Sequence, residues 1–361
     1  MARVMVAMSG GVDSSVAAAL LHEQGHDVVG VAMRLVPDGP VSTARRRSTC
    51  CSHEDFEDAR RVAERFNFPF YVIDLRADFG RRVIDNFVGE YLAGRTPNPC
   101  ARCNGEIKFD RLWQRARAIQ ADFIATGHYA RIEHDYDGHS RLLRAADSDR
   151  DQSYFLFALG QAQLKRTLFP LGAMAKPEVR ERARSLGLLN ADKPDSQEIC
   201  FVPDGNYARF VERNSASREL RAGAIVDSAG NRLGVHQGVH HFTVGQRRGL
   251  KVASSEPVYV REIRAATGEV VVGPRANLAA RGLMANEVRL VDPKIAHAGA
   301  IEIEAKIRYR HPPLPAMLKI LSDGHAEVRF EKPGPAVSPG QACVFYRRDE
   351  VIGGGFIESA L

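Results

Sequence analysis

The chain has 361 residues, a formal net charge of +6, and 44% hydrophobic against 26% charged residues, which favours a globular protein of two or three domains. The basic balance permits a polyanionic partner without requiring one. No apolar run can cross a bilayer, and Met1–Val6 lacks the features of a signal peptide, so we expect a cytoplasmic protein with no membrane partner.

Short apolar runs alternate with helical patterns in the first part of the chain. The predicted strands are Arg3–Met8, Val28–Met33, Phe70–Asp74 and Phe123–Thr126, and the predicted helices cover Val16–Leu21, Asp55–Phe66, Phe79–Leu92 and Phe109–Gln120. Strands separated by helices favour a parallel sheet with helices on both faces, an α/β fold. The polar, arginine-rich segment Val41–Ser48 fits no element and is predicted to be a surface loop.

The pattern changes after about Pro203, where glycine and proline separate short alternating runs. The predicted strands there are Val258–Ile263, Glu269–Val272, Ile301–Tyr309, Glu327–Phe330, Cys343–Tyr346 and Val351–Phe356. Ile301–Ile307 alternates apolar and polar side chains, as a half-buried strand does. This part of the chain is therefore predicted to be antiparallel β, in a small barrel or sandwich.

The segment Ser9-Gly-Gly-Val-Asp-Ser-Ser15 lies between a predicted strand and a predicted helix. Glycines let the backbone turn its N–H groups toward an anion, and the helix adds its positive end. The alternative is a plain turn in which Asp13 or Ser14 caps the helix. The chain has no kinase-type nucleotide loop and no dinucleotide fingerprint after the first strand. The segment instead resembles the loop of ATP pyrophosphatases, which implies that it holds pyrophosphate and that Asp13 binds Mg²⁺ or lies beside the α-phosphate.

Six cysteines are too few for a disulfide scaffold in a chain of this length. Cys100 and Cys103 form a Cys-x-x-Cys pair, which by itself is compatible with zinc, redox or iron–sulfur chemistry. Cys50 and Cys51 are adjacent and do not supply a second pair of zinc ligands, and no set of metal ligands is predicted.

The remaining cysteines differ in context. Cys343 lies on an alternating strand and is interpreted as a buried apolar residue. Cys103 and Cys200 lie in polar, turn-rich segments, which favours reactive thiols, and Arg102 with the loop N–H groups can stabilise a thiolate there.

Taken together, these segments resemble the tRNA-specific 2-thiouridylase family over essentially the whole chain. The other segments that carry the resemblance are Gly94–Asn104, Ile107–Phe109, Ala125–Arg131, Asp151–Phe155, Lys193–Phe201, His240–Gly249 and Gly340–Gln341. The resemblance implies an N-terminal Rossmann-like domain with the ATP pyrophosphatase loop, a small central domain and a C-terminal antiparallel β-barrel. We place these at residues 1–204, 205–277 and 278–361.

The reaction implied by the resemblance begins with ATP and Mg²⁺, which adenylate O2 of the wobble uridine in a tRNA anticodon. A persulfide on Cys200 then attacks C2, and AMP leaves. Cys103 is implied as the partner thiol, which either forms a disulfide with Cys200 or assists the release of sulfide. The implied sulfur donor is a cysteine desulfurase or a sulfur-carrier protein.

Site residues follow from the resemblance position by position. The implied nucleotide site contains Ala7, Met8, Ser9, Gly10, Gly11, Val12, Asp13, Ser14, Met33 and Gly127, with Asp13 also catalytic. The residues implied to face the target base are Asn98, Pro99 and Cys100, and those implied to contact tRNA are His128, Arg150, Asp151, Gln152, Arg308, Tyr309 and Gln341. Two of these have structural alternatives, because Tyr309 can pack in the barrel and His128 can cap a strand end.

Three alternatives stay open. The position of Cys100 is often an aspartate in the family, so Cys100, Cys103 and Cys200 together are also compatible with an iron–sulfur cluster that replaces the persulfide. Another ATP pyrophosphatase, such as an amidotransferase-type synthetase or a lysine ligase acting on tRNA, would share the loop without needing the two cysteines. A basic nucleic-acid-binding protein with a zinc site would need neither Asp13 nor ATP.

Overall fold

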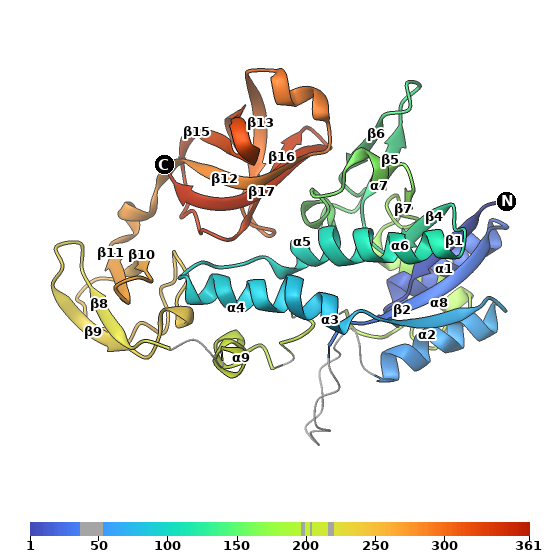
Figure 1. The fold of residues 1–361 in the computed structure, drawn as a ribbon, viewed down its shortest axis with the longest axis horizontal. Helices are drawn as coiled ribbons and strands as arrows, with labels where there is room; N and C mark the ends of the chain where they lie inside the picture. Colours follow the sequence, from blue (N-terminus) through green and yellow to red (C-terminus); the bar gives the residue numbers. More distant parts are fainter. Residues whose placement is uncertain (37–52, 196–198, 203, 216–219) are drawn as a thin grey trace. The chain divides into compact units, whose positions relative to one another are not determined.

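A computed structural model describes residues 1–36, 53–195, 199–202, 204–215 and 220–361 (Figure 1). The chain divides into two compact units. The first unit contains Met1–Val83, Cys100–Gly205 and Asp349–Val351, and the second contains Ile84–Pro99, Asn206–Arg348 and Ile352–Leu361. The predicted loop Val41–Ser48, together with Cys50, Cys51 and Pro203, lies outside the described residues.

Helices and strands alternate along the first part of the chain. In order they are β1 (Arg3–Ala7), α1 (Val12–Glu23), β2 (Asp27–Arg34), α2 (His53–Arg65), β3 (Phe70–Asp74), α3 (Arg76–Phe79), η1 (Gly80–Ile84), α4 (Asp85–Leu92), α5 (Pro99–Cys103), η2 (Asn104–Arg111), α6 (Leu112–Ala118), β4 (Phe123–Thr126), β5 (Arg131–His134), β6 (Ser140–Leu143), η3 (Ser153–Phe155), α7 (Gln161–Leu164), β7 (Thr167–Leu168), α8 (Lys176–Ser185) and α9 (Tyr207–Asn214).

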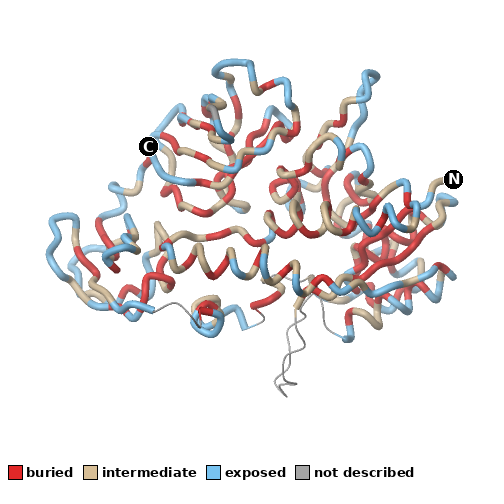
Figure 2. Tube along the Cα trace, viewed as in Figure 1, coloured by how far each residue is buried: buried red, intermediate tan, exposed pale blue. Residues whose placement is uncertain are grey.

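The first unit is built on a parallel sheet with the strand order β3-β2-β1-β4-β7. Successive side chains of β1 point to opposite faces. Val4 and Val6 pack with α1, α2 and α8, whereas Met5 and Ala7 pack with α6. Figure 2 shows β1 and β2 buried along almost all of their length. The predicted parallel sheet with helices on both faces is therefore confirmed.

One predicted helix is interrupted. Phe79–Leu92 is helical as expected, but a π-helical stretch, Gly80–Ile84, separates α3 from α4. A second π-helical stretch, η2, joins α5 to α6, so the helical run that contains Cys100 and Cys103 continues to Ala118. Wider turns of this kind accommodate an extra backbone residue and occur often beside functional sites.

The second part of the chain is mainly β. Its elements are β8 (Gly223–Val226), β9 (Arg232–His236), η4 (Val239–His241), β10 (Tyr259–Arg264), β11 (Glu269–Gly273), η5 (Arg275–Leu278), β12 (Ala280–Leu290), η6 (Pro293–His297), β13 (Ala300–Lys306), β14 (Leu314–Ile320), η7 (Ser322–Gly324), β15 (Ala326–Gly334), β16 (Ala342–Arg347) and β17 (Glu350–Ala360). A small sheet has the order β10-β11-β8-β9.

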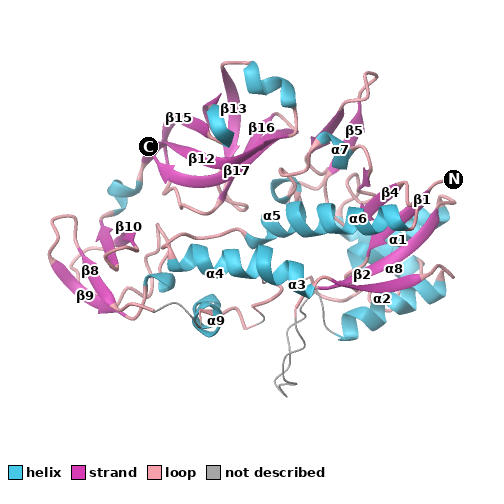
Figure 3. Cartoon of the chain, viewed as in Figure 1, coloured by secondary structure: helices cyan, strands magenta, loops and turns pink. Residues whose placement is uncertain are grey.

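The C-terminal strands close into a barrel (Figure 3). Within residues 280–361, all of which have a described backbone, six strands follow the order β12-β15-β14-β13-β16-β17, and β12 also pairs with β17. Inward-facing side chains such as Ile303, Leu318, Val328 and Phe345 fill the interior. The predicted antiparallel barrel is confirmed, although β13 ends at Lys306, three residues earlier than predicted.

Leu21 provides a test of the packing between α1 and the sheet. It is 3% exposed in the core of the first unit, whereas Leu189 is 83% exposed. Leu21→Ala should lower the free energy of unfolding by about 2–5 kcal/mol because it leaves a cavity. The matched control Leu189→Ala should change it by less than about 0.5 kcal/mol. Urea unfolding, followed by the fluorescence of Trp113, the single tryptophan, measures both; equal effects would contradict the packing described here.

Candidate nucleotide and thiol site

The loop after β1 has a backbone that requires glycine. Gly10 has a φ of +73°, and a Cβ added there would lie 2.2 Å from the carbonyl oxygen of Asp55. Gly11 adopts an extended conformation at the N-cap of α1. Any side chain at Gly10 would therefore push the loop away from α2, so Gly10 fixes the tight turn that was predicted from the sequence, whereas the extended Gly11 has room for a Cβ.

Serine hydroxyls hold this loop from inside. Ser14 Oγ accepts a hydrogen bond from the backbone N–H of Ser9 at 3.1 Å and donates to the carbonyl of Gly11 at 3.1 Å. Ser15 Oγ donates to the same carbonyl at 3.0 Å. Ser14 and Ser15 are buried, whereas Ser9 is exposed. The hydroxyls of Ser14 and Ser15 thus stabilise the turn, and Ser9 is exposed to solvent.

The other predicted nucleotide residues lie at the same edge of the sheet. Gly127 follows β4, and a Cβ added to it would lie 2.7 Å from the backbone nitrogen of Ser14. Met33 lies two residues beyond Val31, which pairs with Ala7 at the end of β1. The strand order reverses between β1 and β4, and ligands of such sheets bind at the carboxyl ends beside this reversal. The structure thus brings Ala7–Ser14, Met33 and Gly127 to one edge.

Two residues that follow α8 in the chain, and that the sequence did not single out as site residues, support the loop. Asn190 Nδ2 donates to the carbonyl of Gly10 at 3.1 Å and to Ser15 Oγ at 2.9 Å. Lys193 Nζ contacts Asp55 at 2.7 Å and Asp58 at 2.6 Å. Burial opposes the charge of Lys193, but its two carboxylate partners outweigh burial and raise its pKa. The loop is therefore tied both to α2 and to the chain after α8.

Asp13, the predicted catalytic carboxylate, is paired with a buried lysine. Lys176 Nζ lies 2.7 Å from Asp13 Oδ1 and 2.7 Å from Asp195 Oδ1, and Lys176 is only 6% exposed. The hydroxyl of Tyr129 donates to Asp13 Oδ1 at 2.8 Å. Burial and the charge of Asp13 raise the pKa of Tyr129, so this hydroxyl keeps its proton.

Asp195 forms ion pairs with three cationic side chains. Besides Lys176, it contacts Arg150 at 2.8 Å and Arg180 at 3.3 Å. Burial would raise the pKa of Asp195, but the hydrogen bond and charge of Lys176 and the charges of both arginines lower it. Because Asp195 lies five residues before Cys200, the chain of contacts Asp13–Lys176–Asp195 connects the loop to the segment that carries this cysteine.

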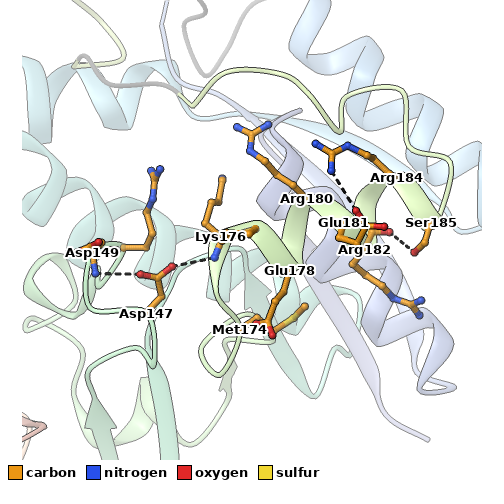
Figure 4. Close-up of a pocket in the computed structure, with 12 residues that line it drawn as sticks. Asp147, Asp149, Met174, Lys176, Glu178, Arg180, Glu181, Arg182, Arg184 and Ser185 are labelled. Atoms are coloured by element: carbon orange, nitrogen blue, oxygen red, sulfur yellow. Dashed lines mark hydrogen bonds and ion pairs between the residues drawn. The ribbon is translucent and has the colours of Figure 1, made fainter.

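A cavity of about 990 Å³ opens beside this chain of contacts (Figure 4). It is lined by Asp147, Asp149, Arg150, Met174, Lys176, Pro177, Glu178, Arg180, Glu181, Arg182, Arg184 and Ser185. Figure 4 shows Lys176, Arg180 and Arg184 along α8, with the guanidinium of Arg184 directed at Glu181. The basic side chains of this lining alternate with the carboxylates of Asp147, Asp149, Glu178 and Glu181, so the cavity is polar and nearly balanced in charge.

The three cysteines of interest all belong to the first unit. Pro99 begins α5, a position that tolerates proline because the first N–H of a helix has no intrahelical partner. Cys100 is exposed and Cys103 is buried one turn later, while Cys200 is half-buried. The Cys103–Cys200 disulfide stays a prediction.

Arg102, predicted to stabilise a thiolate, is paired with a carboxylate, and Cys343 lies in the barrel. Arg102 Nη1 contacts Glu106 Oε1 at 2.7 Å, and Arg82 approaches the same carboxylate at 3.5 Å. Glu106 therefore competes with any thiolate for the charge of Arg102. Cys343 is fully buried on β16, which agrees with its interpretation as an apolar residue, and burial raises the pKa of its thiol.

Two of the three predicted tRNA contacts at residues 150–152 hydrogen-bond to the backbone in this structure. Asp151 is buried, and its carboxylate accepts hydrogen bonds from the backbone of Ala145 and from both N–H and hydroxyl of Ser153. Gln152 Oε1 accepts the backbone N–H of Tyr129 at 3.0 Å. Arg150 is more exposed and holds Asp195. Asp151 and Gln152 therefore act by positioning Tyr129 and its surroundings, and any contact of theirs with RNA stays a prediction.

His128 lies between two aromatic rings at the end of β4. Its Nδ1 hydrogen-bonds with the hydroxyl of Thr126 at 2.7 Å, and its ring centroid lies 6.1 Å from that of Phe109 and 6.0 Å from that of Phe169. Burial, and secondarily the charge of Lys108, lowers the pKa of His128 well below its ordinary 6.5. The imidazole is therefore neutral and suited to stacking or hydrogen bonding with a base.

Predicted tRNA contacts of the second unit lie around the segment before Pro99. Gln341 Nε2 donates to the carbonyls of Thr96 at 2.9 Å and Pro97 at 3.2 Å. Gly340, with a φ of +89°, leaves no room for a side chain, because a Cβ there would lie 2.9 Å from the backbone of Thr96. Gln341 thus holds the backbone of the segment that leads to the half-buried Asn98 and the buried Pro99.

Arg308 and Tyr309 lie in the turn after β13. Arg308 Nη2 donates to the carbonyl of Ala336 at 3.0 Å and to the hydroxyl of Ser338 at 2.8 Å, and also reaches the carbonyl of Val244 at 3.4 Å. Tyr309 is half-buried, with Lys306 Nζ 5.6 Å from its ring centroid. Arg308 ties the central segment to the barrel, and Tyr309 is not enclosed in the barrel interior.

Comparisons with known proteins cover the whole chain. The family model for the tRNA methyl transferase HUP domain matches residues 2–204, that for the tRNA methyl transferase PRC-barrel domain matches 209–274, and that for the aminomethyltransferase beta-barrel domain matches 280–357. The protein called tRNA-specific 2-thiouridylase MnmA in Geotalea uraniireducens is 54% identical over 99% of this chain and 96% of its own length. Proteins of the same name in Geobacter metallireducens and Heliobacterium modesticaldum are 52% and 50% identical, over 99% and 98% of this chain and 97% and 92% of their own lengths.

Within the described residues, every helix is too short or too polar to cross a membrane.

The environment of His128 predicts its behaviour on acidification. Because the folded imidazole resists protonation and the unfolded one accepts a proton near pH 6.5, His128 should destabilise the protein increasingly as the pH falls below 6.5. NMR of protein labelled with ¹³C at histidine Cε1 should show a His128 signal that still has its neutral shift at pH 6.5, where an ordinary histidine is half protonated. A titration midpoint near 6.5 would contradict this account.

Proposed function

We propose that this chain, which belongs to the tRNA-specific 2-thiouridylase family, uses ATP to activate a uridine of tRNA and then replaces its O2 by sulfur. The observation that carries the proposal is that the pyrophosphate-type loop, Cys103 and Cys200 belong to one compact unit, in which Lys176 pairs with Asp13 of the loop and with Asp195, five residues before Cys200. A nucleotide loop alone would support adenylation of many substrates. Its connection to a segment that carries a thiol supports sulfur transfer to the activated group.

The fit of ATP rests on the loop. Gly10, Gly11 and Gly127 let backbone N–H groups approach phosphate oxygens closely, and Ser9 offers an exposed hydroxyl. Lys176 supplies a positive charge beside Asp13, where pyrophosphate would develop charge as it leaves. Asp13 has the oxygen ligands that Mg²⁺ prefers, and a bound Mg²⁺ would neutralise phosphate charge. A second carboxylate, Asp195, keeps Lys176 in place if Asp13 turns to the ion.

Adenylation makes an otherwise unreactive carbonyl replaceable. The oxygen of a uracil carbonyl is a poor leaving group, whereas the same oxygen within AMP is a good one. We infer that O2 of the wobble uridine attacks the α-phosphate of ATP and that pyrophosphate leaves. The base must leave its stack to reach the loop, as it does in other base-modifying enzymes.

Sulfur transfer is assigned to Cys200 and Cys103. In this proposal the terminal sulfur of a Cys200 persulfide attacks C2, and AMP leaves with the former O2. Cys103 then attacks Cys200 Sγ and breaks the bond between Cys200 Sγ and the sulfur that is now attached to C2. The base keeps that sulfur as 2-thiouridine, and a Cys103–Cys200 disulfide remains. A thiol reductant restores both cysteines, and a cysteine desulfurase or sulfur-carrier protein reloads Cys200. The exposed Cys100 is close to Cys103 in sequence, so an iron–sulfur cluster on the three cysteines is the rival route.

Recognition of tRNA is proposed to divide between two kinds of residue. Arg150 and Tyr309 have accessible surface for direct contacts, and Asn98, Pro99 and Cys100 are proposed to face the target base. Contacts to phosphate would weaken as salt rises, because neutralised phosphates release counterions. Asp151, Gln152, Arg308 and Gln341 are proposed to act mainly by holding the backbone that presents these groups.

The division into domains is also part of the proposal. We keep the predicted domains at residues 1–204, 205–277 and 278–361, a division supported by the separate sheets of the central and C-terminal parts. The segment Ile84–Pro99 groups with the second unit although it precedes the cysteine helix. This grouping supports a role for the central and C-terminal parts in holding the chain that leads to Cys100.

Asp13→Asn tests the adenylation step. The substitution keeps the shape of the side chain and leaves Lys176 paired with Asp195, so the fold should survive. Pyrophosphate release in the presence of ATP and unmodified tRNA should fall by at least about 100-fold, since charge at the reacting centre is lost. The exposed Asp137→Asn, in the turn between β5 and β6, should keep full activity. An Asp13→Asn enzyme with normal pyrophosphate release would remove Asp13 from the mechanism.

Cys200→Ser separates adenylation from sulfur transfer. The variant should still form AMP-activated tRNA but produce no 2-thiouridine, because serine cannot carry a persulfide. Cys343→Ser is the control, since Cys343 is buried in the barrel and has no part in the proposed chemistry, and it should thiolate normally once folded. Normal thiolation by Cys200→Ser would contradict the persulfide route. Stoichiometric iron and acid-labile sulfide in protein purified without air would favour the cluster instead.

A further inference from the structure

Three side chains of types that bind metal ions, none of them a cysteine, lie together in the second unit. Glu212 comes from α9, and His240 and His241 come from the short helix η4. Their ligand atoms, one from each residue, lie within 4.8 Å of one another. Neither the proposed adenylation nor the proposed sulfur transfer uses these residues.

The two imidazoles converge on one carboxylate oxygen. His240 Nε2 lies 3.3 Å from Glu212 Oε1, and His241 Nε2 lies 3.4 Å from the same atom. The ring centroids of the two histidines are 4.2 Å apart. Neighbouring residues of a chain ordinarily direct their side chains apart, so the parallel approach of His240 and His241 to Glu212 is a specific feature of this turn.

The two distances that end on Glu212 match the spacing of ligand atoms around a tetrahedral metal ion. Zinc bonds to histidine nitrogen and carboxylate oxygen are about 2.0–2.1 Å long, so two ligand atoms of a tetrahedron lie about 3.3–3.4 Å apart. Both distances to Glu212 Oε1, 3.3 and 3.4 Å, lie in this range, and all three ligand atoms lie within 4.8 Å of one another. Two histidines and a glutamate are also a donor set that zinc uses, with water at the fourth position.

The surroundings fix the cluster while leaving access to it. His240 is only 1% exposed, whereas Glu212 is exposed and His241 half-buried. A Cβ at Gly238 would lie 2.3 Å from His240 Cε1, so glycine is needed for the ring to occupy this place. His236 accepts the N–H of Gly238 at 3.1 Å and thereby holds the turn. One ligand is thus held rigidly and two can be reached from solvent.

We propose that Glu212, His240 and His241 bind a divalent transition metal ion, with Zn²⁺ the best match, which fastens α9 to the turn at residues 238–241. The helix has eight residues and packs on α4 through Tyr207, stacked 4.7 Å from Tyr91, and Phe210, 6.0 Å from Phe87. A short helix gains little stability from its own hydrogen bonds. A metal bond across Glu212 would therefore stabilise the end of α9 opposite its asparagine cap, Asn206.

Titration of tag-free, metal-stripped full-length protein with Co²⁺ tests the site, because Co²⁺ replaces Zn²⁺ and absorbs visible light in a tetrahedral site. Thiolates in general can bind Co²⁺, so the experiment uses Cys200→Ser protein and compares variants within that background. Protein with the intact cluster should bind one more equivalent of Co²⁺ than protein that carries Glu212→Gln or His241→Asn, or should bind this equivalent at least tenfold more tightly. His297→Asn, which removes an exposed histidine elsewhere, should bind like the wild-type cluster.

Thermal unfolding supplies a second measurement. Zn²⁺ should raise the melting temperature of protein with the intact cluster and should raise that of Glu212→Gln less, because only binding to the folded state stabilises it. Glu212 is exposed, so its replacement by glutamine should preserve the fold. Equal Co²⁺ binding and equal thermal shifts in the intact and Glu212→Gln proteins would overturn the proposal and leave the cluster as a set of hydrogen bonds. Neither measurement depends on tRNA, ATP or sulfur transfer.

Discussion

Lys176 is the charge on which the candidate site depends. A buried ammonium group is costly unless carboxylates surround it, and here Asp13 and Asp195 both do so at 2.7 Å. One carboxylate belongs to the loop at the start of α1 and the other to the segment that leads to Cys200. Lys176 itself begins α8, where its backbone N–H donates to Asp147 at 3.0 Å. The position of one side chain thereby sets the loop, the helix and Asp195 relative to one another within the first unit.

The parallel sheet explains why such distant segments meet. All its strands end at one edge, so the loop after β1 and Gly127 after β4 lie together whatever their separation in the chain. The alternation of β1 buries side chains on both faces, which leaves the strand ends as the place for polar chemistry. This much could be predicted from apolar runs and two glycines. The antiparallel barrel was predictable for a similar reason, because alternation and turn residues are local signals.

The partners of the site residues could not be predicted in the same way. Lys176 follows Asp13 by 163 residues, and no periodicity marks an ion pair. Glu212 and the two histidines are likewise separated by 28 residues or more, which is why no metal site was expected. Asp151 is different, since its contact with the N–H of Ser153, two residues on, is a local turn. The Asp-x-Ser pattern could have indicated a structural carboxylate where resemblance implied a contact with RNA.

Sulfur transfer to tRNA is the central claim, and the product itself tests it most directly. Unmodified tRNA is incubated with the protein, ATP, Mg²⁺, a cysteine desulfurase and cysteine, and its nucleosides are then analysed by mass spectrometry. The account predicts 2-thiouridine at the wobble position, with AMP formed in equal amount, and none when ATP or the desulfurase is omitted. Release of AMP and pyrophosphate with a sulfur-free product would contradict it and would indicate another ATP-dependent modification.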